Sequence, residues 1–274
     1  MQIVHTLAEL RQALAPFRHP AVVPTMGNLH QGHLELVRAA QSLGDVTLVT
    51  IFVNRLQFAP HEDFDRYPRT LESDYAQLAA AGCGLVFAPS EDELYPLPQT
   101  FKVQPPSELS DVLEGYFRPG FFTGVCTIVM KLLACTQART AVFGKKDYQQ
   151  LMLVRQMVQQ FAMPIDIVGV ETCRDADGLA LSSRNGYLTT SERERAVLLS
   201  QTLQVFAKAL RLGSTDYSLL ETQAQQALAA AGWAPDYVTV RRRYDLQPPQ
   251  AGDALVVLAA ARLGATRLID NLEV

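Results

Sequence analysis

The sequence predicts an α/β fold, with a parallel sheet in the first two thirds of the chain and a smaller α+β domain in the rest. Short apolar runs alternate with amphipathic stretches to about residue 170, and repeated β and α units favour an open parallel sheet with right-handed crossovers. Residues 46–53 are almost continuously apolar. Such a run is typical of a strand buried on both faces of a parallel sheet.

The expected elements of the first part follow this alternation. The N-terminal residues already predict folded structure, with Thr6 as a helix cap. Gly82 is placed to end a helix, and Pro89 follows the end of a strand. The expected strands are residues 21–24, 46–53, 85–88, 141–143 and 165–170, and the expected helices are residues 32–43, 70–81, 125–135 and 148–161.

The pattern changes near residue 175, where Asp177 and Gly178 predict a turn and residues 181–185 are polar without periodicity. We therefore place a boundary between a domain of residues 1–175 and a domain of residues 176–274. The second domain is expected to contain two helices and three strands. These are a helix that opens on a capping box of Ser191 and Glu194 and runs to about residue 210, a helix at 215–231 closed by Gly232, and strands at 237–241, 255–261 and 266–272.

The composition excludes several classes of protein. The 274 residues are 48% hydrophobic, which is ample for a core, and the formal net charge of −4 argues against nucleic acid as a partner. No window approaches the roughly 18 apolar residues of a membrane-spanning helix. The basic run at residues 241–243 is expected to be solvated or paired with acidic neighbours.

The cysteines indicate the compartment. Cys83, Cys126, Cys135 and Cys173 are far apart and show no CxxC spacing, so we expect free thiols in a reducing compartment. The N-terminus lacks the basic start and long apolar stretch of a secretion signal. We therefore expect a soluble, cytoplasmic protein that binds neither nucleic acid nor a membrane.

The strongest local feature is PTMGNLHQGH, residues 24–33, which lies between the first buried strand and the next helix. Ligands of open α/β sheets bind at the carboxyl ends of strands, and a helix N-terminus offers N–H groups and a positive dipole to phosphate. Gly27 and Gly32 allow the backbone to approach a ligand closely. His30 and His33 are three residues apart, so they project from one side of the first helical turn.

Two imidazoles at such a place can hydrogen-bond phosphoryl oxygens and, when protonated, offset the charge that develops at an α-phosphorus as pyrophosphate leaves. The residues alone leave alternatives open. His30 could cap a turn while His33 packs in a core. A zinc site is a further alternative, but no third ligand stands at a useful spacing, and we expect no metal bound by the protein itself.

Three later segments carry further candidates. Gln57 follows a strand end, where its amide can donate to and accept from a hydroxy acid, although a single loop glutamine is usually solvent-facing. Gly144-Lys145-Lys146-Asp147 lies between a strand and a helix, where lysines can reach phosphate or simply be exposed near a cap. Leu181-Ser182-Ser183-Arg184 offers two hydroxyls and a guanidinium to a triphosphate, unless these residues only solvate a linker.

Together these segments resemble the pantothenate synthetase family. PTMGxLHxGH is the fuller form of the HxGH motif of nucleotidyltransferases, and four further blocks match the family in order and spacing. Five ordered blocks are far more specific than the HxGH element, which alone leaves several cytidylyl- and adenylyltransferases possible. The further blocks are Phe52-Val53-Asn54 with Gln57-Phe58, Glu62-Asp63-Phe64 and Tyr67-Pro68-Arg69-Thr70; residues 143–151; residues 177–185; and residues 260–264 with 266–271.

The resemblance implies a Rossmann-like nucleotide-binding domain followed by a smaller C-terminal α+β lid domain, with ATP and Mg²⁺ between them. It implies that pantoate is activated as an adenylate with release of pyrophosphate, and is then condensed with β-alanine as AMP departs. A homodimer is also implied. Rival interpretations are a nucleotidyltransferase acting on a phosphorylated substrate and a catalytically silent ATP-binding regulator.

By the same resemblance, each candidate receives a role. Catalysis is assigned to His30, His33, Lys146 and Arg184, and the contacts with pantoate and β-alanine to Gln57, Gln150 and Asn54. Lys145 is placed in the ATP-binding stretch, with its side chain expected at the surface. The ATP site would comprise Met26, Gly27, His30, His33, Gly144, Lys145, Lys146, Asp147, Cys173 through its backbone, Leu181, Ser182, Ser183 and Arg184.

Three positions depart from the family pattern. Phe121 stands where a histidine is common, Arg55 where a proline is common, and Ala59 where a glycine is common. Phe121 cannot donate a hydrogen bond, so a loop that a histidine steadies in the family would have to be steadied by packing here. Arg55 loosens the backbone before Gln57. None of the three removes a residue assigned to the chemistry.

Overall fold

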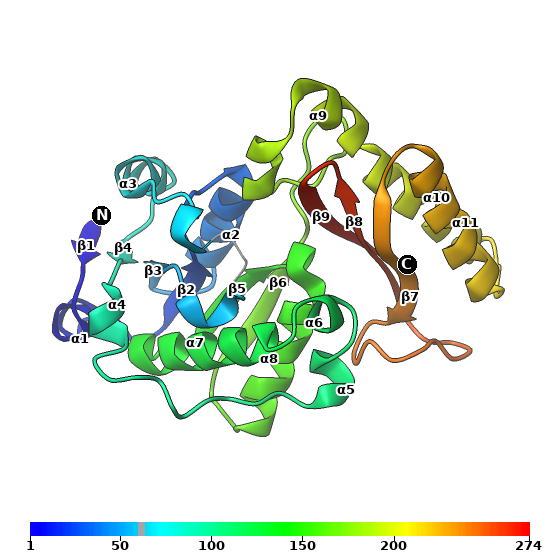
Figure 1. The fold of residues 1–274 in the computed structure, drawn as a ribbon. Coiled ribbons are helices and arrows are strands. Elements are labelled where there is room, and N and C mark those ends of the chain that lie inside the picture. The colour runs from blue at the N-terminus through cyan, green and yellow to red at the C-terminus, as the bar shows by residue number, and fades with distance from the viewer. Residues whose placement is uncertain (60–63) are drawn as a thin grey trace. The chain divides into compact units, whose positions relative to one another are not determined.

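The computed structural model describes residues 1–59 and 64–274 (Figure 1). Glu62 and Asp63 of the second block lie outside the described residues. By packing, the chain divides into two compact units, one of residues 1–144 with 150–171 and one of residues 145–149 with 172–274. The expected domains, 1–175 and 176–274, stay a prediction, but the α/β class is confirmed by the two sheets described below.

The first unit is built on a parallel sheet, as the apolar runs predicted. Within the described residues the sheet has six strands in the order β1-β4-β3-β2-β5-β6. The order reverses at β2, with β3 on one side and β5 on the other, and such a reversal opens a crevice at the strands' carboxyl ends. The strands are β1 (Gln2–Val4), β2 (Pro20–Thr25), β3 (Val46–Ile51), β4 (Leu85–Phe87), β5 (Thr140–Gly144) and β6 (Asp166–Val170).

Helices cover both faces of this sheet, with α2 and α3 on one face and α1, α7 and α8 on the other (Figure 1). Val37 and Ala40 of α2 and Leu78 of α3 are fully buried against Val23 and Val49 of the strands. The helices are α1 (Leu7–Leu14), α2 (Gln31–Gln41), α3 (Leu71–Ala80), α4 (Glu91–Leu94), α5 (Ser107–Ser110), α6 (Glu114–Phe117), α7 (Phe121–Thr136) and α8 (Tyr148–Gln160), with short 3₁₀ turns η1 (Arg55–Gln57) and η2 (Phe64–Arg66).

Local signals explain where these helices begin and end. The predicted cap at Thr6 is confirmed: its hydroxyl accepts from the Glu9 N–H, and the Glu9 carboxylate accepts from the Thr6 N–H. Gly82 follows α3 with a φ of 76°, a backbone conformation that glycine adopts at little cost. Helix α7 starts at Phe121, four residues earlier than the apolar run predicted, directly after Gly120 at a φ of 81°.

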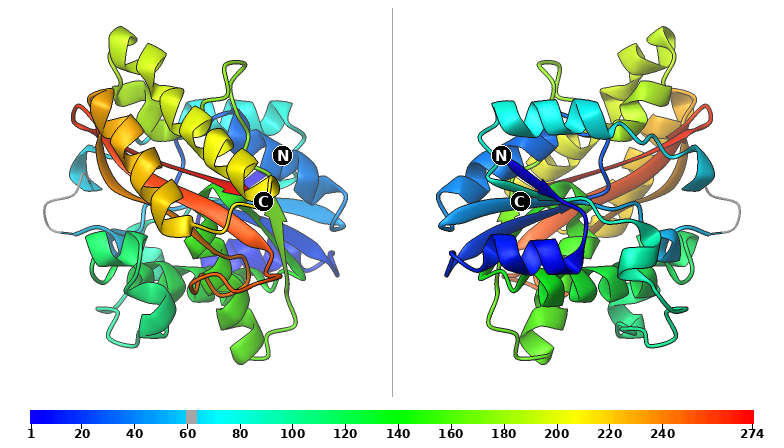
Figure 2. Two further views of the ribbon diagram at one scale, coloured as in Figure 1. Left: turned by 90° about the vertical axis from the view of Figure 1, so that its right-hand side faces the viewer. Right: turned by 90° about the vertical axis from the view of Figure 1, so that its left-hand side faces the viewer.

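The second unit packs two helices against an antiparallel sheet. Helices α10 and α11 lie along one face of the sheet β7-β8-β9 (Figure 2). Leu203, Phe206 and Leu228 of these helices form a core with Val240 and Val257 of the strands. The elements are η3 (Lys145–Asp147), η4 (Ser183–Tyr187), α9 (Thr190–Ala196), α10 (Leu198–Arg211), α11 (Tyr217–Ala230), β7 (Ala234–Arg242), β8 (Leu255–Leu263) and β9 (Thr266–Glu273).

The predicted start of the first helix in this unit is wrong by two residues. The pattern of a hydroxyl followed three residues later by glutamate occurs twice here, and the structure uses Thr189 with Glu192, not Ser191 with Glu194. Leu188, just before this cap, packs against the core, which favours the earlier register. The expected single helix is also divided at Val197 into α9 and α10.

The cysteines are free thiols, and two of the three arginines at 241–243 pair with acids, as expected. Every cysteine is described, and all four are free. Burial raises the pKa of Cys83 to about 11 and that of Cys126 to about 12, so both remain thiols. Arg242 pairs with Asp245 at 2.7 Å, and Arg243 lies 3.4 Å from Glu273. Among the described residues, no helix combines the length and apolarity needed to cross a membrane.

The contact of α7 with η1 yields a prediction about stability. A Cβ on Gly124 would lie 2.1 Å from the Leu56 carbonyl oxygen and 2.8 Å from the Gln57 nitrogen, and backbone cannot move aside as a side-chain tip can. Gly124→Ala should therefore lower the free energy of unfolding by about 1–3 kcal/mol, measured by urea denaturation. The control is Gly186→Ala, because a Cβ at Gly186 has no heavy atom within 4 Å. Equal stabilities of the two variants would contradict the prediction.

Candidate active site

The first group of candidates lies on the loop between β2 and α2, and a buried carboxylate holds this loop. Asp74 of α3 is 1% exposed. It accepts hydrogen bonds from the Asn28 N–H at 3.0 Å, the Leu29 N–H at 2.8 Å and the Thr70 hydroxyl at 3.2 Å. Gly27 and Asn28 both have positive φ, 80° and 51°. The loop thus turns sharply after β2 and leads into the N-terminus of α2.

His30 and His33 form the cap of α2. The Nδ1 atom of His30 accepts from the Gly32 N–H at 3.1 Å, and Nδ1 of His33 accepts from the His30 N–H at 3.3 Å. The ring centroids are 4.1 Å apart. The expected capping by His30 is therefore present, whereas His33 is half-buried against the His30 ring.

The two capping bonds assign a tautomer to each ring. A ring nitrogen that accepts a hydrogen bond carries no proton, so these bonds place the proton of each neutral ring on Nε2. A doubly protonated ring could not accept either bond. The geometry therefore favours two neutral imidazoles, each with an Nε2–H donor, over the protonated imidazoles considered from the sequence.

A second group lies at the carboxyl end of β3. The Gln57 amide is half-buried, donates to Met26 Sδ at 2.9 Å and accepts from Asn54 Nδ2 at 3.2 Å. The structure thus joins the second sequence block to the first. Gln150 lies on the first turn of α8, half-buried, in the same unit.

Asn54, expected to contact substrate, has hydrogen-bond partners in the protein itself. It is 1% exposed. Its Nδ2 donates to Gln57 Oε1 and to the Gly124 carbonyl, each at 3.2 Å, and its Oδ1 accepts from the Tyr95 hydroxyl at 2.9 Å and the Leu56 N–H at 3.4 Å. Burial, with a smaller effect of Glu91, raises the pKa of Tyr95, so the hydroxyl stays protonated and can donate. The geometry suits Asn54 to orient Gln57.

Cation–π contacts occupy two of the three positions that depart from the family pattern. The Arg118 guanidinium lies 3.6 Å from the Phe121 ring centroid and donates to the Gln57 carbonyl at 3.2 Å. Arg55 lies 3.9 Å from the Phe64 ring centroid and pairs with Glu91 at 3.1 Å. Packing therefore steadies the segment at Phe121, as expected from its lack of a donor. Arg118 was not among the predicted site residues, because its only local signal is the aromatic pair at residues 121 and 122.

The candidates at residues 144–147 are divided between the two units. Gly144 ends β5 in the first unit, whereas Lys145, Lys146 and Asp147 form η3 in the second. The expectation of a surface position for the Lys145 side chain is wrong. Its ammonium pairs with Glu273 at 2.9 Å, and only 16% of the side chain is exposed. The attraction of the partly buried Glu273 carboxylate draws the ammonium in. The sequence pattern could not show this partner, because it lies 128 positions away.

The remaining candidates also lie in the second unit. The Ser182 hydroxyl accepts from the Arg184 N–H at 3.3 Å and caps η4, which contains Ser183 and Arg184. The Cys173 carbonyl accepts from the Leu181 N–H at 2.9 Å. Next to this bond, an antiparallel backbone bridge joins Arg174 to Ala180. The segments that contain Cys173 and Ser182 therefore lie side by side.

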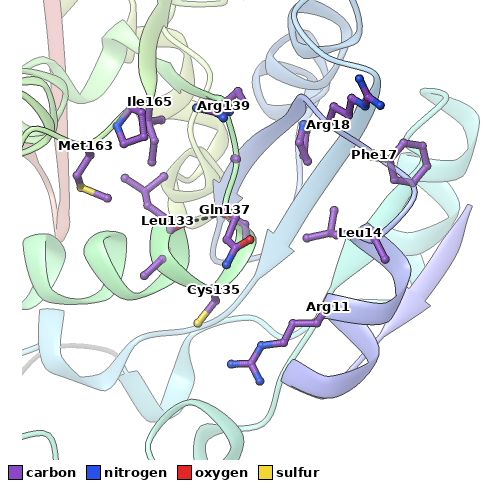
Figure 3. A pocket seen from close by; sticks show the side chains of 16 residues that line it. Arg11, Leu14, Phe17, Arg18, Leu133, Cys135, Gln137, Arg139, Met163 and Ile165 are labelled. Atoms are coloured by element: carbon purple, nitrogen blue, oxygen red, sulfur yellow. Dashed lines mark hydrogen bonds between the residues drawn. The ribbon is translucent and has the colours of Figure 1, made fainter.

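A cavity of about 570 Å³ lies at the other end of the first unit's sheet (Figure 3). It is lined by the last turns of α1 and α7 and by the residues that lead into β2, β5 and β6. Helix C-termini carry unpaired carbonyls and partial negative charge, which the lining residues Arg11, Arg18 and Arg139 complement. Ligands of such sheets bind at the opposite, carboxyl ends of the strands, so we place the candidate site there. Within residues 1–59 and 64–274, no three His, Cys, Asp or Glu side chains gather closely enough to hold a metal ion.

The carboxylate of Asp74 yields a second prediction. Asp74→Asn keeps the size but turns a charged acceptor of three hydrogen bonds into an amide, which should cost about 1.5–3 kcal/mol of unfolding free energy. Amide hydrogen exchange at Asn28 and Leu29 should accelerate by roughly 10-fold or more, because their acceptor is weakened. Glu72→Gln, an exposed acid in the same helical turn, is the control. Unchanged exchange at both amides in Asp74→Asn would show that the carboxylate does not hold the loop.

Comparison with known proteins identifies the family of the chain. The family model described as pantoate-beta-alanine ligase matches residues 2–273. The chain is 64% identical over 279 residues to the pantothenate synthetase of Verminephrobacter eiseniae and 63% identical over 285 residues to that of Leptothrix cholodnii, with 100% of both chains covered in each case.

Solved structures agree as well. The crystal structure of the pantothenate synthetase of Thermus thermophilus matches with a TM-score of 0.95 at 43% identity, over 100% of this chain and 99% of that one. The pantoate-beta-alanine ligase of Francisella tularensis, crystallised with beta-gamma ATP and beta-alanine, matches with a TM-score of 0.82 at 32% identity, over 100% of this chain and 97% of that one. The chain therefore belongs to the pantoate-beta-alanine ligase family, the enzymes also called pantothenate synthetases.

Proposed function

We propose that the chain joins pantoate to β-alanine by way of a pantoyl adenylate, with ATP as the activating substrate. The observation that carries the proposal is the pair of histidine rings that caps α2 at the carboxyl end of β2. A free carboxylate resists attack by amines, whereas AMP is a leaving group that hydrogen-bond donors can stabilise. The relative crystallised with beta-gamma ATP and beta-alanine supports ATP and β-alanine as substrates. The relatives do not support the rival nucleotidyltransferase or regulator.

The reaction has two balanced halves. A pantoate carboxylate oxygen forms a bond to the α-phosphorus of ATP, and the bond from that phosphorus to the bridging oxygen breaks as pyrophosphate leaves. The amine of β-alanine then attacks the pantoyl carbonyl carbon. AMP departs with the carboxylate oxygen it received, and the new amide nitrogen loses a proton.

His30 and His33 are assigned to the first half as hydrogen-bond donors. Their Nδ1 atoms are committed to the cap, so each Nε2–H is directed by the helix and does not have to be ordered when the substrate binds. Such prearranged donors stabilise negative charge as it develops on the α-phosphoryl oxygens and on the leaving group. A neutral ring donates from Nε2 and still accepts the capping bond at Nδ1, whereas a protonated ring would lose that bond.

The remaining roles follow from the residue types and their supports. We assign Lys146, Ser182, Ser183 and Arg184 to the triphosphate, as a set of cation and hydroxyl donors, and Mg²⁺ enters with ATP. Gln57 and Gln150 bind pantoate, and Asn54 acts through Gln57. The backbones of Met26, Gly27, Gly144, Cys173 and Leu181, with Lys145 and Asp147, complete the ATP site.

Three broader properties are part of the proposal. Residues 1–175 carry the pantoate and most nucleotide contacts, and residues 176–274 act as a lid that excludes water from the adenylate, since a mixed anhydride hydrolyses readily. The free thiols of all four described cysteines fit a cytoplasmic location. The protein acts as a homodimer.

The test of the adenylate mechanism is isotope exchange. Purified protein with ATP, Mg²⁺ and pantoate, but no β-alanine, should incorporate labelled pyrophosphate into ATP, because the first half-reaction is reversible while the adenylate stays bound. Exchange should vanish without pantoate. A protein that makes pantothenate from the complete mixture but shows no pantoate-dependent exchange would rule out the adenylate, and one that does neither would rule out the activity.

The catalytic role of His33 can be separated from its role in the helix cap. His33→Asn retains an acceptor near the position of Nδ1 but has nothing near Nε2, so the cap should survive while exchange turnover falls by about 10²–10³-fold. His33→Gln places an amide nearer the Nε2 position and should recover part of the loss. His19→Ala, which removes an exposed imidazole of the same unit, is the control. Near-normal turnover in His33→Asn would show that His33 is purely structural.

A further inference from the structure

The C-terminal strand β9 holds the lysine segment of the second unit from one face. Asn271 and Glu273 are two residues apart, so their side chains point to the same side of β9. Asn271 is 5% exposed, and its amide donates to the carbonyl oxygen of Lys145 at 2.9 Å and to that of Lys146 at 2.8 Å. One side chain thus fixes two consecutive peptide groups of η3.

Glu273 holds the side chains on either side of Lys146. Its carboxylate accepts from the Lys145 ammonium at 2.9 Å and from the Tyr148 hydroxyl at 2.8 Å. Burial alone would raise the pKa of Glu273, but the hydrogen bonds from Lys145 and Tyr148 and the charges of Arg243 and Lys145 outweigh it and hold that pKa below its ordinary value. The carboxylate is therefore ionised near neutral pH, and a charged group anchors the segment.

Lys146 itself has a fixed backbone, while its side-chain ammonium has no partner among the described residues. Among the described residues, the Lys146 ammonium makes no hydrogen bond or ion pair, and the residue is half-buried. A lysine side chain loses rotamer freedom when its charge is held in one place, so any motion of the backbone beneath it would add to the cost of binding phosphate. The contacts of Asn271 remove that motion.

The opposite face of β9 holds the other segment assigned to the nucleotide. Asp270 is 3% exposed and binds the Arg174 guanidinium in a two-pronged ion pair at 2.7 and 2.9 Å. Arg174 also donates to the Gly178 and Asn271 carbonyls, each at 3.1 Å. Arg174 directly follows Cys173, so the end of β9 supports this segment as well as residues 145–149.

We propose that Asn271 and Glu273 are positioning residues for the adenylation reaction, which set the backbone of Lys146 so that its ammonium meets the triphosphate of ATP. The inference rests on the proposed function and assigns a task to the terminal sequence block, whose residues carry no chemistry of their own. The competing explanation is that both side chains only stabilise the fold. Kinetic measurements on the wild-type protein and on the Lys146→Ala variant separate the two explanations.

The first measurement compares wild type with Asn271→Ala in pantoate-dependent pyrophosphate exchange. The loss of two hydrogen bonds that fix the Lys146 backbone should lower kcat/KM for ATP by roughly 10- to 100-fold. The KM for pantoate should change little, because Gln57 and Gln150 belong to the other unit. A fold-stabilising role alone would leave both constants of the folded fraction near wild type.

The second measurement repeats the substitution in a Lys146→Ala background. If Asn271 acts through Lys146, Asn271→Ala should cost less than about 3-fold once the ammonium is gone, because residues that act on one step are not additive. Glu273→Gln, which keeps the side-chain volume but removes the charge, should show the same pattern with a smaller loss. It also provides the test if Asn271→Ala does not fold.

Leu272→Ala is the matched control on the same strand. Leu272 points to the opposite side of β9 and packs against the core of the second unit, so its truncation should lower the melting temperature without a selective effect on ATP. Its kinetic effect should be equal in the Lys146 and Lys146→Ala backgrounds.

Two results would overturn the inference. One is a wild-type kcat/KM for ATP in both Asn271→Ala and Glu273→Gln. The other is a loss of equal size in the Lys146 and Lys146→Ala backgrounds, which is the behaviour of independent sites. Failure of the proposed function would give a different result, because wild-type protein would then show no pantoate-dependent exchange at all. That result would overturn both the proposed function and this inference.

Discussion

The geometry of the histidine loop depends on one buried carboxylate. Asp74 comes from α3 and meets backbone N–H groups that lie 45 and 46 positions earlier in the chain. A Cβ on Gly27 would lie 3.0 Å from the Asp74 carboxylate and 3.0 Å from the Ile51 side chain, at a φ of 80°. Glycine is therefore required at this position both for its backbone conformation and for the close approach of the carboxylate. With the turn fixed in this way, the chain reaches His30 in the extended conformation that a helix cap needs.

The two interpretations of His30 and His33, as structural caps and as catalytic donors, are compatible. Each imidazole has two nitrogens with different tasks, and a cap that uses Nδ1 as acceptor fixes both the tautomer and the direction of Nε2–H. The common N-cap residues offer a single short side chain, which cannot cap a helix and also reach a ligand. Histidine can do both. The HxGH spacing separates the two histidines by three residues, which places them on the same side of the first helical turn. This explains why the ring centroids lie 4.1 Å apart.

Elements with a strong local period could be predicted from the sequence, and long-range partners could not. The apolar runs at β2, β3 and β5 and the amphipathic stretches of α2, α3 and α8 located these elements to within a few residues, because burial on a sheet or helix face repeats with a fixed period. The capping box at Thr189 was misplaced because two overlapping patterns satisfied the same rule. Asp74, Arg118 and Asn271 were missed because each acts on a residue 45 to 126 positions away. For Asp74 one signal existed, an acid on the apolar side of a helix, where an unpaired charge is too costly to bury.

Residues 145–149 show why a boundary in sequence differs from a boundary in packing. The segment follows β5 and includes the first two residues of α8. Strand β5 and the rest of α8 belong to the first unit, yet the contacts of the segment are with the second. The reason is charge and hydrogen bonding: Asn271 and Glu273 offer two amide donors and an ionised carboxylate, and the segment presents carbonyls, an ammonium and a phenol that match them. The groups assigned to the triphosphate, Lys146, Ser182, Ser183 and Arg184, are thereby supported by the core of the second unit. The groups assigned to pantoate and the α-phosphorus are supported by the core of the first. A sequence pattern cannot show this division, since it arises from contacts between the chain's last strand and its middle.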